Sequence, residues 1–74
     1  MPPLSPQDVE HLFVSHTMSE DQKVHSQRIR NAAKEFTKVL IANTPPSADQ
    51  TAAVRKVREA VFTANAAIVL KGQF

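Results

Sequence analysis

The sequence has no cysteine, only one glycine, and neither tryptophan nor tyrosine. The lack of cysteine excludes disulfides and thiolate metal sites, which are two of the usual ways of stabilising a very small domain. The single glycine, Gly72, excludes the glycine-rich loops that cradle phosphates, because those motifs need several glycines at fixed spacing. Any phosphate bound by this chain must therefore be held by side chains.

Long hydrophobic runs are also lacking. No stretch of about 18 apolar residues occurs, so we expect no membrane-spanning helix. The opening residues, MPPLS, do not have the charged and then apolar regions of a secretory signal. From these two observations we expect a soluble protein of the cytoplasm.

The length of 74 residues allows one small domain. For a chain of this size, area scaling gives roughly 4,500 Å² of folded surface, and burial of apolar area contributes about 110 kcal/mol. Ordering the whole chain costs about the same free energy. Because the monomer is marginal and has no disulfide, we expect it to self-associate.

Three serine-initiated capping patterns predict where helices begin. In each pattern the serine accepts from backbone N–H groups, and the third residue after it bonds back. The patterns are SPQD at 5–8, SEDQ at 19–22 and SADQ at 47–50.

The fold class that follows is all-α, with the whole chain, 1–74, as a single helical domain. A short helix is expected at about 5–13, and two longer helices at about 20–43 and 48–71. Thr44-Pro45-Pro46 ends the second helix, and Gly72 ends the third. The short connection between the two long helices predicts an antiparallel hairpin.

Helical spacing gathers the apolar residues into stripes. In the second helix one stripe is predicted to face the core, and His25 within it is interpreted as a packed residue. That stripe consists of His25, Ile29, Ala32, Ala33, Phe36, Val39 and Leu40. The last helix has a first stripe that faces its hairpin partner, made of Ala53, Val54, Val57, Ala60, Val61, Ala64 and Ile68.

A second stripe on the last helix consists of Phe62, Ala66 and Val69. A single hairpin partner covers only one stripe, so we interpret the second as a contact between subunits. A generic dimer contact without functional meaning is the alternative.

Basic residues form a ridge on the second helix, opposite its apolar stripe: Lys23, Arg30, Lys34 and Lys38. Such a ridge can meet a polyanion or the phosphates of a small ligand. A solvated helix face explains the same pattern and stays open as an alternative.

The three histidines, His11, His16 and His25, do not have the spacing of metal ligands on one helical face. No arrangement of nucleophile, histidine and acid can be specified, and a helical hairpin lacks the concave walls of a preorganised active site. We therefore expect no metal, no cofactor and no enzymatic activity.

Phe13 and His16 belong to the link between the short helix and the hairpin, where an exposed ring can stack on a base. For Phe13 the favoured interpretation is packing of the short helix onto the hairpin. His16 is expected to be exposed.

Several of these segments together resemble the phage anti-CBASS protein two family. The resemblance covers about residues 12–71, and ANAAI at 64–68 is its most distinctive part. It also rests on Pro46-Ser47, Ala53, Val57, REAVF at 58–62, Phe13, His16, Gln22 and Ile29-Arg30.

The resemblance implies a helical subunit that assembles into homohexamers. It implies a sponge that binds cyclic di- and trinucleotides such as cGAMP without degrading them, and so protects the phage in the cytoplasm of the infected bacterial host. The ligand-binding residues that it implies are Phe13 or His16, which flank the family's stacking position, for the base, Arg30 and Lys34 for phosphate, and Lys71 for a separate trinucleotide pocket.

The chain departs from the family pattern at three places. Val14 and Ser15 stand where the family has its stacking aromatic, Leu70 stands where a basic residue is common, and Phe62-Thr63 replaces Met-Trp.

Two other functions compete with the sponge. One is a nucleic-acid-binding or regulatory protein, which a net charge of +2 and the acids of residues 1–22 disfavour. The other is a structural phage protein or adaptor.

Overall fold

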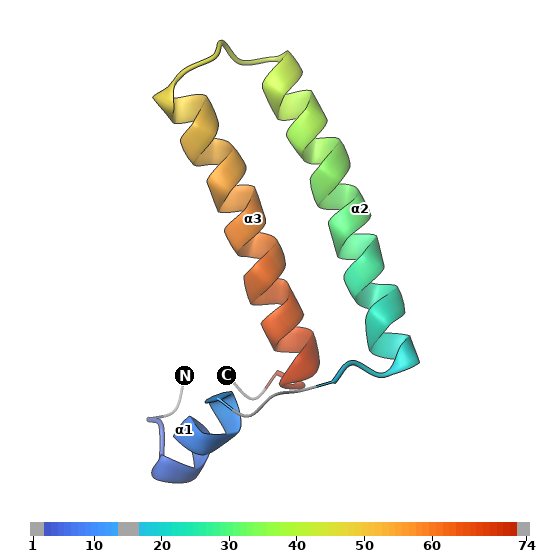
Figure 1. Ribbon diagram of the computed structural model, residues 1–74, viewed down its shortest axis with the longest axis vertical. Helices are drawn as coiled ribbons and strands as arrows, with labels where there is room; N and C mark the ends of the chain where they lie inside the picture. Colours follow the sequence, from blue (N-terminus) through green and yellow to red (C-terminus); the bar gives the residue numbers. More distant parts are fainter. Residues whose placement is uncertain (1–2, 14–16, 73–74) are drawn as a thin grey trace.

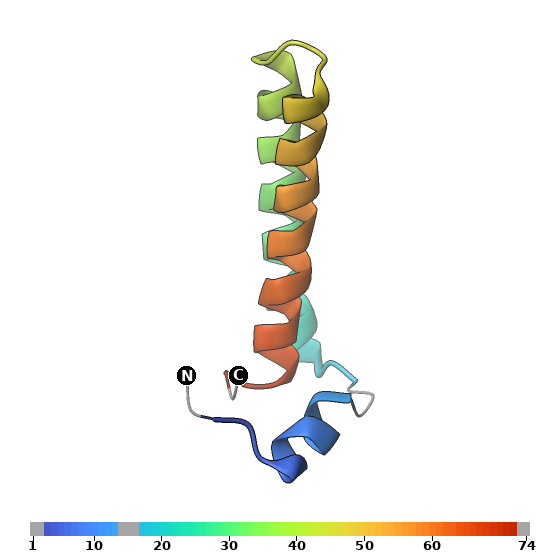
Figure 2. The same ribbon diagram turned by 90° about the vertical axis from the view of Figure 1, so that its left-hand side faces the viewer.

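The computed structural model describes residues 3–13 and 17–72, and this part of the chain is helical with no strand. Its helices are α1 (Pro6–Phe13), α2 (Glu20–Ala42) and α3 (Ala48–Val69). In Figure 1, α2 and α3 run side by side in opposite directions, and α1 lies at the end of the hairpin away from the turn. Figure 2 shows the hairpin edge-on as a single layer. The predicted all-α class and the hairpin are confirmed.

Two of the predicted caps form completely. At α2 the Ser19 hydroxyl accepts from the Gln22 backbone N–H at 3.2 Å, and the Gln22 side-chain oxygen accepts from the Ser19 N–H at 2.9 Å. At α1 the same exchange joins Ser5 and Asp8, at 3.1 and 2.9 Å. These bonds satisfy donors that the first helical turn leaves without partners, so both helices begin where the serines predict.

The third cap forms only in half. The Ser47 hydroxyl accepts from the Gln50 backbone N–H at 3.1 Å. The Gln50 side chain does not bond back to Ser47, because its amide donates to the Thr44 carbonyl at 3.2 Å and to the Ile41 carbonyl at 3.4 Å. Gln50 thus ties the start of α3 to the turn and to the end of α2.

The last helix ends at Val69 and is closed by Lys71 and Gly72. Lys71 is the first left-handed residue, with a φ of 55°, and its N–H donates to the Ile68 carbonyl at 3.3 Å. The Gly72 N–H donates to the Ala67 carbonyl at 3.0 Å, so two terminal helical carbonyls are satisfied. The place of the closure is as predicted, but the residue in the left-handed position after the cap is Lys71 and not Gly72.

The seam between α2 and α3 contains both apolar and polar side chains. Ser26 is buried, at 4% exposure, and its hydroxyl donates to the Asn65 side-chain oxygen at 2.8 Å. Near the same end, the Gln22 amide donates to the Ile68 carbonyl at 3.0 Å. The other half-buried seam residues are Ile29, Ala33, Thr37 and Leu40 of α2, with Val54, Val57, Val61 and Ala64 of α3.

Only one edge of the predicted core stripe of α2 faces this seam, and it consists of Ile29, Ala33 and Leu40. The rest of the stripe is exposed: His25 and Ala32 are exposed, and Phe36 and Val39 are 57% and 58% exposed. At about 100° per residue, the seam is turned by roughly 60° from the centre of the stripe. The interpretation of His25 as a packed residue is therefore wrong. Ser26 takes a seam position because Asn65 satisfies its hydroxyl, and a pattern of apolar residues alone does not register such a pair.

The predicted first stripe of α3 is mostly in place. Val54, Val57, Val61 and Ala64 are half-buried in the seam, while Ala60 is exposed beside it. Ala60 lies next to the displaced stripe of α2, so both helices leave apolar side chains on the same side of the hairpin.

These side chains form what we call the apolar face. It contains a groove of about 430 Å³ lined entirely by apolar residues. The groove residues are Ile29, Ala32, Ala33 and Phe36 of α2 with Val57, Ala60, Val61 and Ala64 of α3.

The molecule exposes more surface than a compact chain of its size. Its accessible area is 5971 Å², against the roughly 4,500 Å² that scaling with mass gives. Its extents of 46 × 28 × 19 Å describe an elongated layer. Among the described residues, Leu70 is the only apolar side chain classed as buried, so the monomer has almost no closed core.

The residue of α1 that lies beside the end of the hairpin is Leu12 and not Phe13. Leu12 lines a groove together with Asn65, Ala66, Val69 and Leu70 at the end of α3. Phe13 is 85% exposed, so the interpretation that it packs the short helix onto the hairpin is wrong. Of the helices in the described part of the chain, none is long and apolar enough to cross a membrane.

Candidate anion-binding groove

A second groove lies on the side of the hairpin opposite to the apolar face, with a volume of about 240 Å³. The cationic residues are Arg30 and Lys34 from α2 and Arg58 from α3. The remaining lining residues are Ala33 and Thr37 of α2 with Val57, Val61 and Phe62 of α3. Arg30 and Lys34 are four positions apart, as are Arg58 and Phe62, and side chains at this spacing share one face of a helix.

The ring of Phe62 forms part of the wall of this groove. The Arg58 guanidinium carbon lies 5.9 Å from the centre of the ring, within the range of a cation–π interaction. Phe62 is nevertheless 62% exposed. An exposed ring beside cationic groups offers a surface on which a nucleobase can stack.

The cations of the groove are not neutralised by acids. In the described part of the chain the ion pairs are Lys23 with Glu20 and Lys38 with Glu35, each at 3.3 Å. The groove residues Arg30, Lys34 and Arg58 take part in neither pair, and no carboxylate or imidazole lines the groove. Its chemistry is therefore that of an anion-binding site, with groups that neutralise phosphate from two helices.

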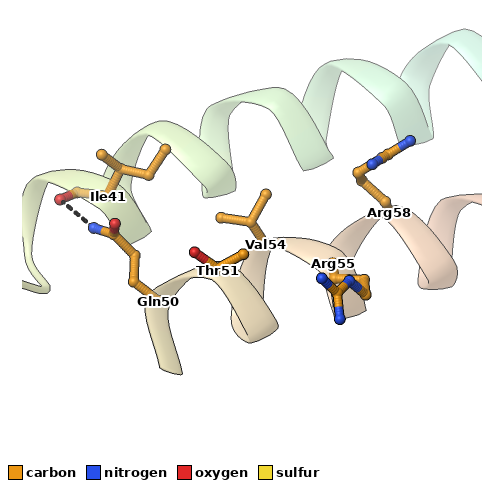
Figure 3. A pocket seen from close by; sticks show the side chains of 6 residues that line it. All are labelled: Ile41, Gln50, Thr51, Val54, Arg55 and Arg58. Carbon is orange, nitrogen blue, oxygen red and sulfur yellow. Dashed lines mark hydrogen bonds between the residues drawn. The ribbon is translucent and has the colours of Figure 1, made fainter. Parts of the chain in front are cut away.

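Two further grooves lie beside this one, and each shares one arginine with it. Arg30 also lines a groove of about 460 Å³ with Met18, Lys23, Ser26 and Gln27. Arg58 also lines a groove of about 300 Å³ near the turn, with Ile41, Gln50, Thr51, Val54 and Arg55. Figure 3 shows this last groove, with Arg58 extending from α3 toward α2. We call the surface formed by Lys23, Arg30, Lys34, Arg55 and Arg58 the basic face.

Of the ligand-binding residues predicted from the sequence, the structure brings together Arg30 and Lys34. Phe13 lies on α1 and lines none of the three grooves of the basic face. Lys71 is exposed beyond the end of α3, with a φ of 55°. His16 lies outside the described residues. Lys38, the last member of the predicted ridge, is paired with Glu35.

Sequence reasoning missed two residues of the groove, Arg58 and Phe62. Arg58 was not part of any predicted ridge, and Phe62 was assigned to a subunit contact because it belongs to an apolar stripe. Their four-residue spacing is the signal that could have paired them. Only the packing of α3 on α2 sets them opposite Arg30 and Lys34.

No metal centre is apparent in the described part of the chain, where no three histidine or acidic side chains gather closely enough to hold an ion. The fold and the groove together define a small helical-hairpin protein with a basic face. Comparisons with protein families, with curated proteins and with solved structures found no match for the chain.

Proposed function

We propose that the protein is a non-enzymatic sponge that binds and sequesters the cyclic di- and trinucleotides of bacterial CBASS immunity. It acts for a phage in the cytoplasm of the infected host. The observation that carries the proposal is the groove in which Arg30 and Lys34 lie opposite Arg58 and Phe62. A nucleotide needs both kinds of group, since cations neutralise its phosphate and a ring stacks on its base. That the nucleotide is cyclic is inferred from the sequence resemblance to the anti-CBASS protein two family.

The size of the groove favours a site that more than one subunit completes. Pockets that enclose small ligands measure about 300–1,000 Å³, and this groove of about 240 Å³ is below that range. A second copy of the chain would cover the part of the ligand that the groove leaves open. A cyclic dinucleotide with two identical bases has two-fold symmetry, which suits a two-fold contact between subunits.

The exposed surface also supports an oligomer. The accessible surface of the monomer is 5971 Å², whereas a compact chain of this mass exposes roughly 4,500 Å². The excess surface is larger than the area of about 800 Å² that each partner buries in a stable interface. We place the main subunit contact on the apolar face, where Phe36 is 57% exposed beside small alanines. A homohexamer is the assembly that the family resemblance implies.

Native mass spectrometry with a panel of cyclic di- and trinucleotides tests the proposal, because it reports the number of subunits and the number of ligands together. We expect an oligomer that carries intact cyclic nucleotide. After heat denaturation, chromatography of the supernatant should return the ligand in its cyclic form. An oligomer that retains no member of the panel, or linear product in proportion to protein, would contradict the proposal.

A further inference from the structure

The basic face is longer than the groove assigned to a cyclic nucleotide. Lys23 lines the groove at one end and Arg55 the groove at the other, and neither belongs to the central groove. Arg30 lines two of the three grooves and Arg58 another two, so the grooves follow one another along the hairpin. Along α2, the three grooves form a track from Lys23 to Ile41, about 27 Å at ~1.5 Å per residue. The cations of α2 in this track extend from Lys23 to Lys34, about 17 Å. A track of this shape fits an extended ligand better than a compact one.

We propose that the basic face binds a segment of single-stranded nucleic acid that lies along the hairpin. This is a second ligand class for the protein, beyond the cyclic nucleotides of the proposed function. The two ligands share Arg30 and Arg58, so each should displace the other.

The distribution of charge supports a polyanion as the ligand. The formal net charge of the chain is only +2. However, the residues that line the three grooves include five cations and no carboxylate, and within the described part of the chain only Lys23 of these cations is in an ion pair, with Glu20. Asp8 and Glu10 lie on α1, outside the hairpin, and Asp21 lies about 180° around α2 from Arg30. The packing of α2 on α3 thus brings four cations other than Lys23 to one side of a weakly charged protein, and such a surface attracts phosphate chains.

The aromatic group favours a single strand over a duplex. Phe62 is 62% exposed within the track, and its ring can stack only on a base whose face is free. The bases of a duplex are already stacked, so a duplex would use the cations alone. A track of about 27 Å accommodates roughly four nucleotides, which is the lower end of known single-strand sites.

Fluorescence anisotropy with labelled oligothymidylates of about 2 to 12 nucleotides tests this inference. We expect the affinity to rise with length up to roughly four to six nucleotides and then to change little. The logarithm of the affinity should fall linearly with the logarithm of the salt concentration, by about 0.7 for each phosphate contacted. A duplex of the same length should bind more weakly than the single strand at the same salt concentration.

Arg55→Ala and Lys56→Ala form a matched pair of variants. Both remove one positive charge from α3, but Arg55 lines the groove near the turn, whereas Lys56 lines none of the three grooves. Arg55→Ala should weaken oligonucleotide binding about three- to tenfold at low salt and reduce the salt slope by about 0.7. Lys56→Ala should change the affinity less than twofold. Circular dichroism checks that both variants keep their helices, as expected for alanine in a helix.

Three results would overturn the inference: no binding of any oligonucleotide at low salt, equal losses in the two variants, or tighter binding of the duplex. Equal losses would mean that binding reports net charge only. The titration with a cyclic dinucleotide is a separate measurement. If the protein binds oligothymidylate but no cyclic dinucleotide, the proposed function is rejected and the inference about single strands stands. If it binds the cyclic dinucleotide but no oligothymidylate, the inference is rejected and the proposed function stands.

Discussion

Arg30 reaches the central groove from α2 and Arg58 reaches it from α3. A phosphate bound between them would be held by two helices at once, which makes its position depend on the hairpin itself. A guanidinium can grip phosphate through two parallel hydrogen bonds, and an ammonium group cannot. At the scale of residues, the two arginines therefore define the site more sharply than Lys34 does.

We expect Arg30→Ala to weaken the binding of a cyclic dinucleotide about ten- to a hundredfold, since a charge-assisted contact is worth about 1.5–3 kcal/mol. Arg30→Lys should also weaken it, because the paired hydrogen bonds are lost. Arg28→Ala is the matched control: it is the same residue type on the same helix, about 200° away around the axis. Calorimetric titration compares the three variants. If Arg30→Ala binds with the same affinity as the parent protein, Arg30 does not contact the ligand and the binding site lies on another part of the surface.

Phe62 has two competing roles, a stacking surface in the groove or a contact between subunits. We expect Phe62→Ala to lower the affinity for a cyclic nucleotide by about 1–3 kcal/mol, the usual contribution of one stacked base. The mass of the oligomer should not change. Calorimetry and sedimentation on the same sample separate the two roles. A smaller mass with Phe62→Ala would support the subunit contact that the apolar stripe predicts.

At the scale of elements, two polar contacts hold the register between α2 and α3. Ser26 donates to Asn65 within the seam, and Gln22 donates to the Ile68 carbonyl while it also caps α2. A polar pair inside a seam allows one alignment of the helices and disfavours others, because a shifted helix would leave both groups without partners. The alignment matters for the proposed function, since it sets Arg58 opposite Arg30.

We expect Ser26→Ala to lower the free energy of unfolding by about 1–3 kcal/mol, because the Asn65 amide loses its buried partner. Thr63→Ala is the control, because it removes an exposed hydroxyl that donates only to the Glu59 carbonyl. Its effect should stay within about 0.5 kcal/mol. Urea denaturation measures both changes at one protein concentration. A similar small effect for the two variants would show that the buried pair does not hold the seam.

At the scale of the whole molecule, the hairpin presents two opposite surfaces. One side carries the apolar face around Phe36, and the other carries the basic face around Arg30 and Arg58. A single layer of two helices cannot cover its own apolar side (Figure 2). We therefore expect self-association to bury the apolar face and to leave cations available for ligand.

Phe36→Glu should dissociate the oligomer, because it would place an unpaired charge in a buried contact. Thr63→Glu introduces the same charge at an exposed position outside the apolar face and should leave the mass unchanged. Sedimentation at micromolar concentration distinguishes the two variants. A full-size oligomer with Phe36→Glu would place the subunit contact on another surface.

The sequence alone determined the local structure of this protein. Each helix start depends on a serine hydroxyl, that of Ser5, Ser19 or Ser47, which accepts from the backbone N–H three residues further along. The closure beyond α3 depends on the backbone of the neighbouring residues Lys71 and Gly72. The shared face of Arg30 and Lys34 follows from helical periodicity. All of these are interactions within a few residues, so a pattern in the sequence is enough to predict them.

Only the tertiary structure decided which side of each helix faces the other. The rotation of α2 that exposes Phe36 depends on Ser26 meeting Asn65, and these residues are 39 positions apart. The position of Arg58 opposite Arg30 in the central groove depends on the same alignment. Periodicity gives the width of an apolar stripe but not the partner that covers it, because a satisfied polar pair competes with apolar side chains for the same seam.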